Sequence, residues 1–405
     1  MVRRAFAKFG ALSLTAALSL LAGSAAAQGT ARSLDIDTSV RSQGRGSASN
    51  AVFWDGGNEW ANPALLGYRN GFSVTWDHQQ LVPQLADDVV MSTRRVSLGL
   101  WGLGVSVAGQ PIDVIGGSDL EYGWSESTDI FGNPVPGPYS FEHTRAWSLG
   151  ASLAGVFDEL SARFGRSSSI SDWADVAVGG SRKRVAVAFF APYTYGTDAT
   201  DIGVFARVSP IDTRRSAPGG AGSTQRLDVG YGHSVINAND AFIDYGGFSG
   251  PSPLSRIKRD GGSIGWTLRA SPEKVKASRG LWRILGPDQA LWRAVLAYDR
   301  EHVSAGDEET YAYDVEHWGA EVSMGRLCAA RVGHVLDRAG EIDGFSLGVG
   351  VGAPLGPLAE LAYDFASIPQ GGDLNNRYAH SLTFRLDVLG TLKHWREEAP
   401  DAAAN

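Results

Sequence analysis

Apolar and polar residues alternate one by one along many short segments of this chain. In residues 378–388, for example, Leu382 and Phe384 alternate with Ser381 and Thr383. The same pattern occurs in residues 71–78, 93–100, 103–110, 143–154, 183–191, 201–209, 224–234, 260–269, 290–299, 313–324, 327–335, 343–352 and 359–366. Because successive side chains of a strand point to opposite faces, each segment is predicted to be a strand with one apolar face. The sequence therefore predicts an all-β protein.

The polar face of these strands is unusual, because it consists mostly of Gly, Ser and Ala. A soluble β-sandwich would hide its apolar face and show a charged one. A transmembrane antiparallel β-barrel turns its apolar face to lipid and its polar face inward, with aromatic residues at both interfaces. The 12 Trp residues, many of them near strand ends, favour the barrel. A soluble extracellular sandwich that binds sugars or protein is the alternative.

Fifteen candidate strands are present, whereas bacterial single-chain barrels have an even number. The weakest candidate is 155–182, where Leu160, Ala162 and Phe164 alternate before a Ser run breaks the pattern. We predict about fourteen strands over residues 71–389, with twelve and sixteen as the other even counts. Tight connections near 101–102, 325–326 and 353–356 are predicted to be periplasmic turns. Residues 111–141 and 235–258 are predicted to be loops, on the extracellular side.

The amino terminus predicts export. Arg3, Arg4 and Lys8 precede an apolar run over residues 10–23, and an Ala-x-Ala cleavage pattern ends at Ala27. Residues 1–27 are therefore predicted to be a secretory signal peptide, since the run is too short to span a bilayer comfortably. Together with the strand pattern, this predicts a protein of the cell outer membrane. Residues 390–405 form a polar carboxy-terminal tail.

The composition narrows the function classes. The formal net charge of −8 argues against a nucleic-acid partner, and a single Cys excludes a disulfide framework and any Cys-based zinc site.

The 51 Gly residues, roughly one in eight, exceed the usual ~7%. Those on the predicted inward face are Gly99, Gly104, Gly150, Gly333, Gly348, Gly350 and Gly352. This predicts an inner wall that a hatch, a ligand or a cargo can approach closely.

The sequence predicts neither an enzyme nor a cofactor, because no nucleophile elbow, phosphate loop or metalloprotease motif is present. His233, Ser234 and Asn237 match the residue types of an outer-membrane phospholipase but not its spacing. Adjacent strand residues such as His233 and Ser234 also face opposite sides. Asp55 and Glu59 could bind a cation, but two carboxylates in a Gly-rich loop more often lie in water, so no metal site is predicted.

The alternation also predicts which charged side chains face the lumen. They are Arg95, Arg293, Glu321, Arg331, Glu360, Asp364, Arg385 and Asp387. Glu360 and Asp364 lie on the strand next to the one that bears Arg385 and Asp387, so a ladder of charges is expected there. The set is either an ion-pair network that fills the barrel and holds a hatch, or a polar path or ligand site.

Residues 28–70 precede the first strand, do not alternate, and contain Asn62-Pro63-Ala64. An Asn-Pro-Ala motif before the barrel resembles the FadL superfamily of outer-membrane proteins, and more closely its PorV/PorQ branch. The carboxy-terminal third continues the resemblance with His317-Trp318-Gly319-Ala320-Glu321 and Arg331-Val332-Gly333-His334. The resemblance covers residues 44–110 and 313–388. The polar tail departs from the family, whose final strand usually ends the chain with an aromatic residue.

The resemblance implies that residues 28–70 form a hatch inside the barrel, whereas the residues alone also allow a plain turn at Asn62-Pro63-Ala64. It further implies transport of hydrophobic small molecules through a hatch-gated lumen. The PorV branch implies a second function, a secretion-system component that handles exported protein cargo at the outer membrane. The expected partners are membrane lipid, the barrel assembly machinery, and a hydrophobic ligand or an exported protein.

Overall fold

The computed structural model describes residues 31–54, 57–84, 90–109, 118–122, 127–128, 134–135, 140–166, 169–190, 193–213, 223–246, 251–269, 290–305, 308–355, 358–372 and 374–388. The predicted signal peptide and carboxy-terminal tail, as well as Asp55, lie outside these residues. Within the described part of the chain, no helix is long and apolar enough to cross a membrane.

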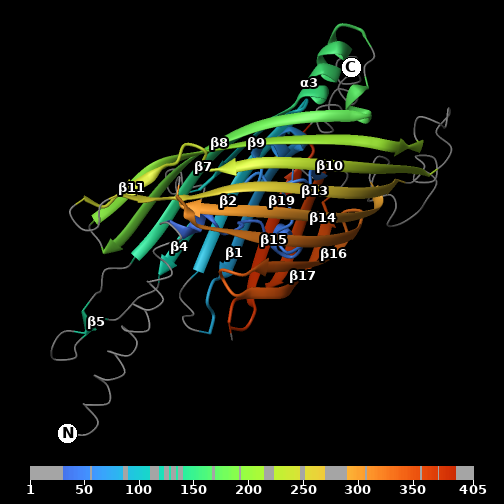
Figure 1. The fold of residues 1–405 in the computed structure, drawn as a ribbon. Coiled ribbons are helices and arrows are strands. Elements are labelled where there is room, and N and C mark those ends of the chain that lie inside the picture. Colours follow the sequence, from blue (N-terminus) through green and yellow to red (C-terminus); the bar gives the residue numbers. More distant parts are fainter. Residues whose placement is uncertain are drawn as a thin grey trace, which may run out of the picture.

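The strands form one closed antiparallel barrel (Figure 1). Except for β3 and β4, each wall strand pairs with the next along the chain, and β1 (Gly71–Gln80) pairs with both β2 (Val90–Leu100) and the last strand, β19 (Arg377–Leu386). The other wall strands are β3 (Leu103–Ala108), β4 (Ser118–Tyr122), β7 (Ser140–Ser152), β8 (Ala174–Phe190), β9 (Tyr193–Asp212), β10 (Thr224–Ile236), β13 (Ser255–Arg269), β14 (Ala290–Ala305), β15 (Glu308–Met324), β16 (Cys328–Asp337), β17 (Ile342–Pro354) and β18 (Ala359–Ile368).

Strands β3 and β4 share one position in the wall, because both pair with β2 on one side and β7 on the other. The described residues therefore form a barrel of fourteen strand positions, which confirms the predicted count. The same pairing corrects the prediction that residues 111–141 are all loop, since Ser118–Tyr122 lies in the wall. Two short hairpins, β5–β6 (Ser127–Thr128 and Pro134–Val135) and β11–β12 (Phe242–Asp244 and Pro251–Pro253), lie outside the wall.

The outer surface of the barrel is apolar. On β14, Leu296 is 62% exposed, while its neighbours Val295 and Ala297 are buried on the lumen side. Leu347 and Val349 on β17 are likewise exposed. A closed ladder satisfies every strand backbone without water, and only such a structure can present this surface to hydrocarbon. The chain is therefore a transmembrane barrel of the outer-membrane type, and the soluble sandwich is wrong.

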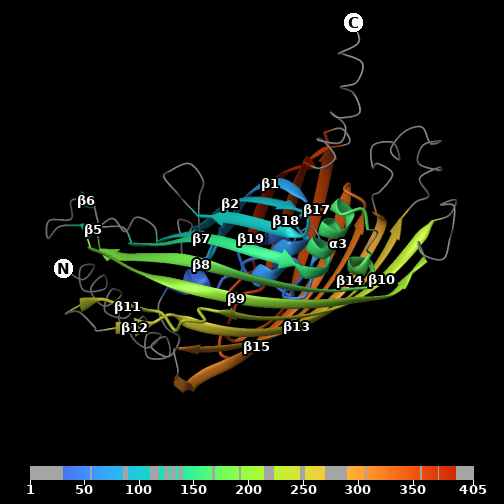
Figure 2. The same cartoon turned by 90° about the horizontal axis from the view of Figure 1, so that it is seen from above.

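We call the two rims of the barrel the turn end and the loop end. The turn end carries the tight β2–β3 and β15–β16 connections and the longer β7–β8 connection, and both the start of β1 and the end of β19 lie there. The loop end carries the β10–β13 connection with its β11–β12 hairpin and the short interval between β14 and β15. Figure 2 shows the strands running between these two rims.

Residues 153–163 correct one sequence interpretation. The alternation of Leu160, Ala162 and Phe164 suggested a weak strand, but Leu153–Arg163 forms helix α3 between β7 and β8. Ser152 is its N-cap, and the Ser152 hydroxyl accepts a hydrogen bond from the Gly155 amide. The short helix η4 (Ile170–Asp172) then leads back to the wall. A Ser cap followed by apolar residues three and four apart is a helix signal that the period-two interpretation overlooked.

Residues 31–54 and 57–70 lie inside the barrel, and we call them the lumenal segment. They contain the helices η1 (Arg32–Leu34), α2 (Val40–Gln43) and η3 (Pro63–Tyr68). These appear in blue within the ring of strands in Figures 1 and 2. Most side chains of the segment are buried, Ala64, Leu65 and Leu66 completely. The packed interior of this barrel therefore lies between the lumenal segment and the inner wall.

Candidate functional site

The lumenal segment rests on glycines of the inner wall. A Cβ atom at Gly104 would overlap the Leu66 carbonyl, and one at Gly333 would overlap the Arg45 backbone. Each of these wall residues is Gly because a side chain there would occupy the space of the segment's backbone. The inward glycines Gly99, Gly150 and Gly348 meet the segment in the same way, whereas Gly350 and Gly352 face wall residues.

Asn62-Pro63-Ala64 lies in the interior, where it begins helix η3. The Asn62 side-chain oxygen accepts a hydrogen bond from the Ala64 amide (3.1 Å), so Asn62 is the N-cap, and Pro63 takes the first helical position. The Asn62 side-chain nitrogen donates to the carbonyls of Asn50 and of Val204 on β9, both at 3.1 Å. The motif therefore closes a turn and joins the lumenal segment to the wall.

One buried carboxylate, Glu321 on β15, pairs with three guanidinium groups. Arg41 and Arg45 of the lumenal segment reach it at 2.5 and 2.7 Å, and Arg331 of β16 reaches it at 2.9 Å. Arg331 also pairs with Asp364 of β18 at 2.6 Å. The Glu321 side chain is 1% exposed, so these pairs are desolvated and depend on one another. This cluster holds α2 and the following turn against strands β15 to β18.

A second cluster surrounds Glu59 in the lumenal segment. Arg95 of β2 pairs with the Glu59 carboxylate at 3.2 Å, and the Ser106 hydroxyl of β3 donates to it at 3.0 Å. Burial raises the pKa of Glu59, but Arg95 and Arg69 outweigh burial and bring that pKa below its ordinary value. Glu59 therefore stays charged and fastens the segment on the side opposite Glu321.

Backbone amides of the segment are also bound by the wall. Asp299 of β14 accepts hydrogen bonds from the Ser49 and Asn50 amides at 2.6 and 2.8 Å. The Ser234 hydroxyl of β10 donates to the Ala61 carbonyl at 2.7 Å. These bonds replace the helix or sheet partners that an irregular segment lacks. These polar contacts add to the apolar contacts that the segment makes with the wall.

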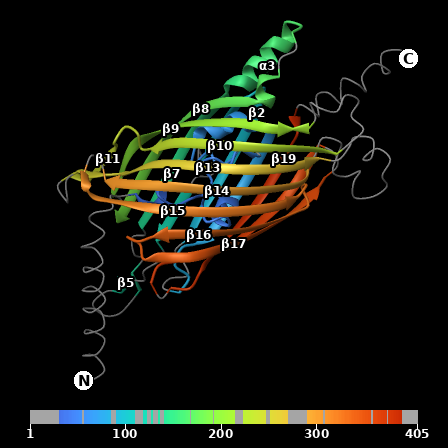
Figure 3. The ribbon, with the colours of Figure 1, turned by 45° about the vertical axis from the view of Figure 1, so that its right-hand side comes forward.

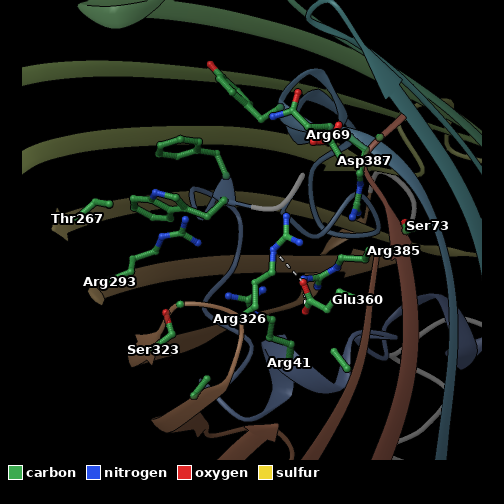
Figure 4. Close-up of a pocket in the computed structure, with 18 of the residues that line it drawn as sticks. Arg41, Arg69, Ser73, Thr267, Arg293, Ser323, Arg326, Glu360, Arg385 and Asp387 are labelled. Carbon is green, nitrogen blue, oxygen red and sulfur yellow. Dashed lines mark ion pairs between the residues drawn. The ribbon is translucent and has the colours of Figure 1, made fainter. Parts of the chain in front are cut away.

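A cavity of about 760 Å³ opens at the turn end and extends to the lumenal segment. Figure 4 shows Arg326 and Arg385 converging on Glu360, with Arg293 and Arg69 on other sides of the space. The Glu360 carboxylate lies 3.4 Å from Arg326 and 3.5 Å from Arg385. Nine arginines and six carboxylates line the cavity, so its lining is net positive. The cavity is therefore a polar vestibule lined by charged side chains.

The loop-end half of the lumen contains a buried apolar cluster, which lies beside the buried Lys183–Asp201 ion pair. Val185 and Val187 on β8 pack with Leu34 and Trp60 of the lumenal segment. Ile243 of the β11 hairpin and Leu254 belong to the same buried cluster. A molecule passing from the loop end to the turn end would therefore meet this cluster, to which the lumenal segment contributes Leu34 and Trp60, before it reached the charged vestibule.

The structure places the eight charged residues predicted for the lumen as follows. Arg293, Arg331, Glu360, Asp364, Arg385 and Asp387 line the vestibule. Arg95 and Glu321 lie deeper, in the two clusters that hold the lumenal segment. Glu360 and Arg385 are register partners whose charged groups lie 3.5 Å apart, whereas Asp364 pairs with Arg331.

Sequence reasoning missed the partners that the lumenal segment contributes. Arg41, Arg45 and Glu59 lie in a stretch without periodicity, so no pattern assigned them a direction. Asp299 lies on the inward face of β14, so the alternation along that strand could have identified it as a lumen-facing carboxylate. Lys183 and Asp201, which pair at 2.7 Å with both side chains 1% exposed, could have been found in the same way.

The remaining candidate chemistry receives no support. Ser234 faces the lumen and His233 faces outward, where it pairs with Asp260 at 2.9 Å, so the two do not form a site together. Among the residues described, no group of three or more His, Cys, Asp or Glu side chains is arranged to hold a metal ion.

No family model matches the chain, and no curated protein matches it. Solved structures do resemble it. A mutant of the monoaromatic hydrocarbon channel TodX is 9% identical, with 86% of this chain and 98% of that chain covered and a TM-score of 0.43. The toluene transporter TbuX of Ralstonia pickettii is 9% identical, with 85% and 97% covered and a TM-score of 0.42. A FadL homologue of Pseudomonas aeruginosa is 9% identical, with 89% and 99% covered and a TM-score of 0.40.

At these identities and TM-scores the likeness carries no argument about function. The barrel is established by the strand pairing of the chain itself, and its place in the outer membrane by the apolar outer surface and closed ladder.

Proposed function

We propose that this protein is an outer-membrane channel for small hydrophobic molecules, with the lumenal segment as its movable hatch. The observation that carries the proposal is the position of the lumenal segment between a buried apolar cluster at the loop end, to which it contributes Leu34 and Trp60, and an open vestibule at the turn end. A molecule of largely apolar surface would be favoured at the cluster and released into water from the vestibule.

The inner wall beside the segment supports movement. The segment packs on the wall through apolar side chains as well as through ion pairs and hydrogen bonds, such as those of Glu321 and Asp299. Water can replace the polar contacts when the segment moves. The glycines leave a smooth inner wall beside the segment, so no wall side chain has to reorient at those positions.

A disulfide lock tests the hatch. The hydroxyls of Ser33 in the segment and Thr144 on β7 lie 3.4 Å apart, so the pair Ser33→Cys and Thr144→Cys joins segment to wall. Both changes are made in a Cys328→Ser background, which removes the only native thiol. We expect oxidation to abolish uptake of a hydrophobic probe such as toluene or a fatty acid into proteoliposomes, and reduction to restore it.

The matched control joins two wall strands. Ser73 on β1 and Ser97 on β2 have hydroxyls 3.1 Å apart and are register partners, so the pair Ser73→Cys and Ser97→Cys leaves the segment free. Its oxidation should leave uptake unchanged. Uptake that is equally fast in the oxidised segment lock would contradict a moving hatch, and absence of uptake in every form would contradict a channel.

The second candidate is a PorV-like component that handles exported cargo. The buried ion pairs that Arg45 and Glu59 of the segment make with the wall favour it, because a firmly closed barrel suits a platform better than a pore. In that case the locked protein should support surface delivery of cargo as well as the reduced protein does. Loss of delivery on oxidation would count against the platform.

A further inference from the structure

Helix α3 has an apolar stripe that no part of the described protein covers. Leu153, Phe157, Leu160 and Phe164 follow one another at spacings of four, three and four residues, so they lie on one face of the helix. Phe157 is 53% exposed and Phe164 is 81% exposed. Four large apolar side chains in water on one short helix are unfavourable unless something covers them.

The helix is fixed at the turn-end rim rather than hanging on a loose loop. Asp175 at the start of β8 accepts hydrogen bonds from the Ala154 amide (2.9 Å) and from the Ser152 hydroxyl. Asp158 accepts hydrogen bonds from the Ile170 and Ser171 amides, which ties α3 to η4. Figures 1 and 3 show α3 projecting away from the wall at this rim. The direction of the stripe is therefore set by the fold.

The stripe continues the lipid-facing surface of the barrel. Leu153 follows Leu149 on the outward face of β7, and Trp173, after η4, precedes the outward Val176 and Val178 of β8. All of these side chains are exposed. Because the outward faces of β7 and β8 contact hydrocarbon, the stripe begins where that contact ends.

Aromatic side chains place α3 at the level of the lipid headgroups. Trp101, in the neighbouring β2–β3 turn, is exposed at the same rim, and the Arg163 guanidinium lies 4.8 Å from the centre of its ring. Trp173 is 60% exposed just before β8. Trp residues gather at membrane interfaces, where an amphipathic helix also lies with its apolar face in the acyl boundary.

We propose that α3 is an interfacial helix whose apolar stripe inserts into the phospholipid leaflet at the turn end of the barrel. It would anchor the β7–β8 rim to the membrane and set the depth of this side of the wall. The continuity of the stripe with the hydrocarbon-facing strands favours lipid over a protein partner. The inference does not depend on the transport function.

Spin labels on single cysteines test it. In a Cys328→Ser background, Phe157→Cys and Leu160→Cys report the stripe, and Glu159→Cys and Ala162→Cys report the other faces of the same helix. The labelled proteins are reconstituted in vesicles of phosphatidylethanolamine and phosphatidylglycerol. Collision rates with oxygen, which concentrates in lipid, and with a nickel chelate, which stays in water, are then measured.

We expect the ratio of oxygen to nickel collisions to be several-fold higher at 157 and 160 than at 159 and 162. If collisions with the nickel chelate dominate at all four positions, the proposal is wrong, because the stripe then lies in water, where a protein partner would have to cover it. Equal ratios on both faces would also overturn it, since the helix would then lack a fixed face toward lipid. Heat-modifiable migration of each labelled protein confirms that its barrel is folded.

Discussion

Gly333 on β16 lies directly against the backbone of Arg45, so that a single methyl group at position 333 would overlap the Arg45 carbonyl carbon and the Gly46 nitrogen. Arg45 also pairs with Glu321 on the neighbouring strand, β15. The absence of a side chain on one strand thus permits an ion pair on the next.

We predict that Gly333→Ala lowers the free energy of unfolding by about 1–3 kcal/mol, because overpacking forces either the wall or the segment to shift. Urea unfolding in detergent micelles measures this loss, and limited proteolysis shows whether the segment is displaced. The matched control is Gly262→Ala on β13, where the nearest atom to the added carbon is the Gly230 oxygen at 3.9 Å. Equal losses in the two variants would contradict the close seating.

Glu321→Gln removes the common partner of Arg41, Arg45 and Arg331. We expect a loss of about 3–5 kcal/mol, because the buried Arg45 and Arg331 and the partly buried Arg41 lose a charge that offsets their desolvation. The same unfolding assay measures it. Glu159→Gln on α3 is the control, since its exposed pair with Arg163 contributes only about 0.3–0.5 kcal/mol. A loss below 1 kcal/mol for Glu321→Gln would show that water fills the site.

Leu296→Arg places a charge on the outward face near the middle of β14. We predict a cost of about 2–4 kcal/mol for unfolding from a bilayer, whereas Trp292→Arg at the turn-end start of the same strand costs about 0–1 kcal/mol. Equilibrium unfolding from phosphatidylcholine vesicles compares the two variants. The reverse order of costs would mean that the hydrocarbon contacts the turn-end start of β14 rather than its middle.

Acid should loosen the lumenal segment through Glu59. Because the pKa of Glu59 is lower in the folded protein than its ordinary value of 4.5, its contribution to stability is present above that value. The contribution is lost as the pH falls through the lower, folded pKa. Protease cleavage of the segment should therefore accelerate below about pH 4.5. Glu59→Gln should be cleaved faster at neutral pH and show a smaller acid effect, and an unchanged acid effect would assign the acid response to other carboxylates.

The wall was predictable from sequence because the strand period assigns each residue a face. Leu296 and Glu321 follow directly from it, as do the glycines on the inward side. Helix α3 was missed because Leu160, Ala162 and Phe164 fit period two over too short a span to exclude a helical period. The attachments of Arg45 and Glu59 could not be predicted, since they depend on residues far away in the chain and the lumenal segment has no period.

The lumenal segment precedes β1, yet its contacts reach almost every later strand. Arg45 and Glu321 are separated by 276 positions, and Gly44 and Ser346 by 302. The final pairing of the wall joins β1 to β19, so the first part of the chain acquires its partners only when the last part arrives. Contacts so distant in sequence make folding slow. Complete seating of the segment and closure of the seam therefore both require the last strands of the chain, and any factor that holds β1 and β19 apart also leaves the lumen without part of its wall.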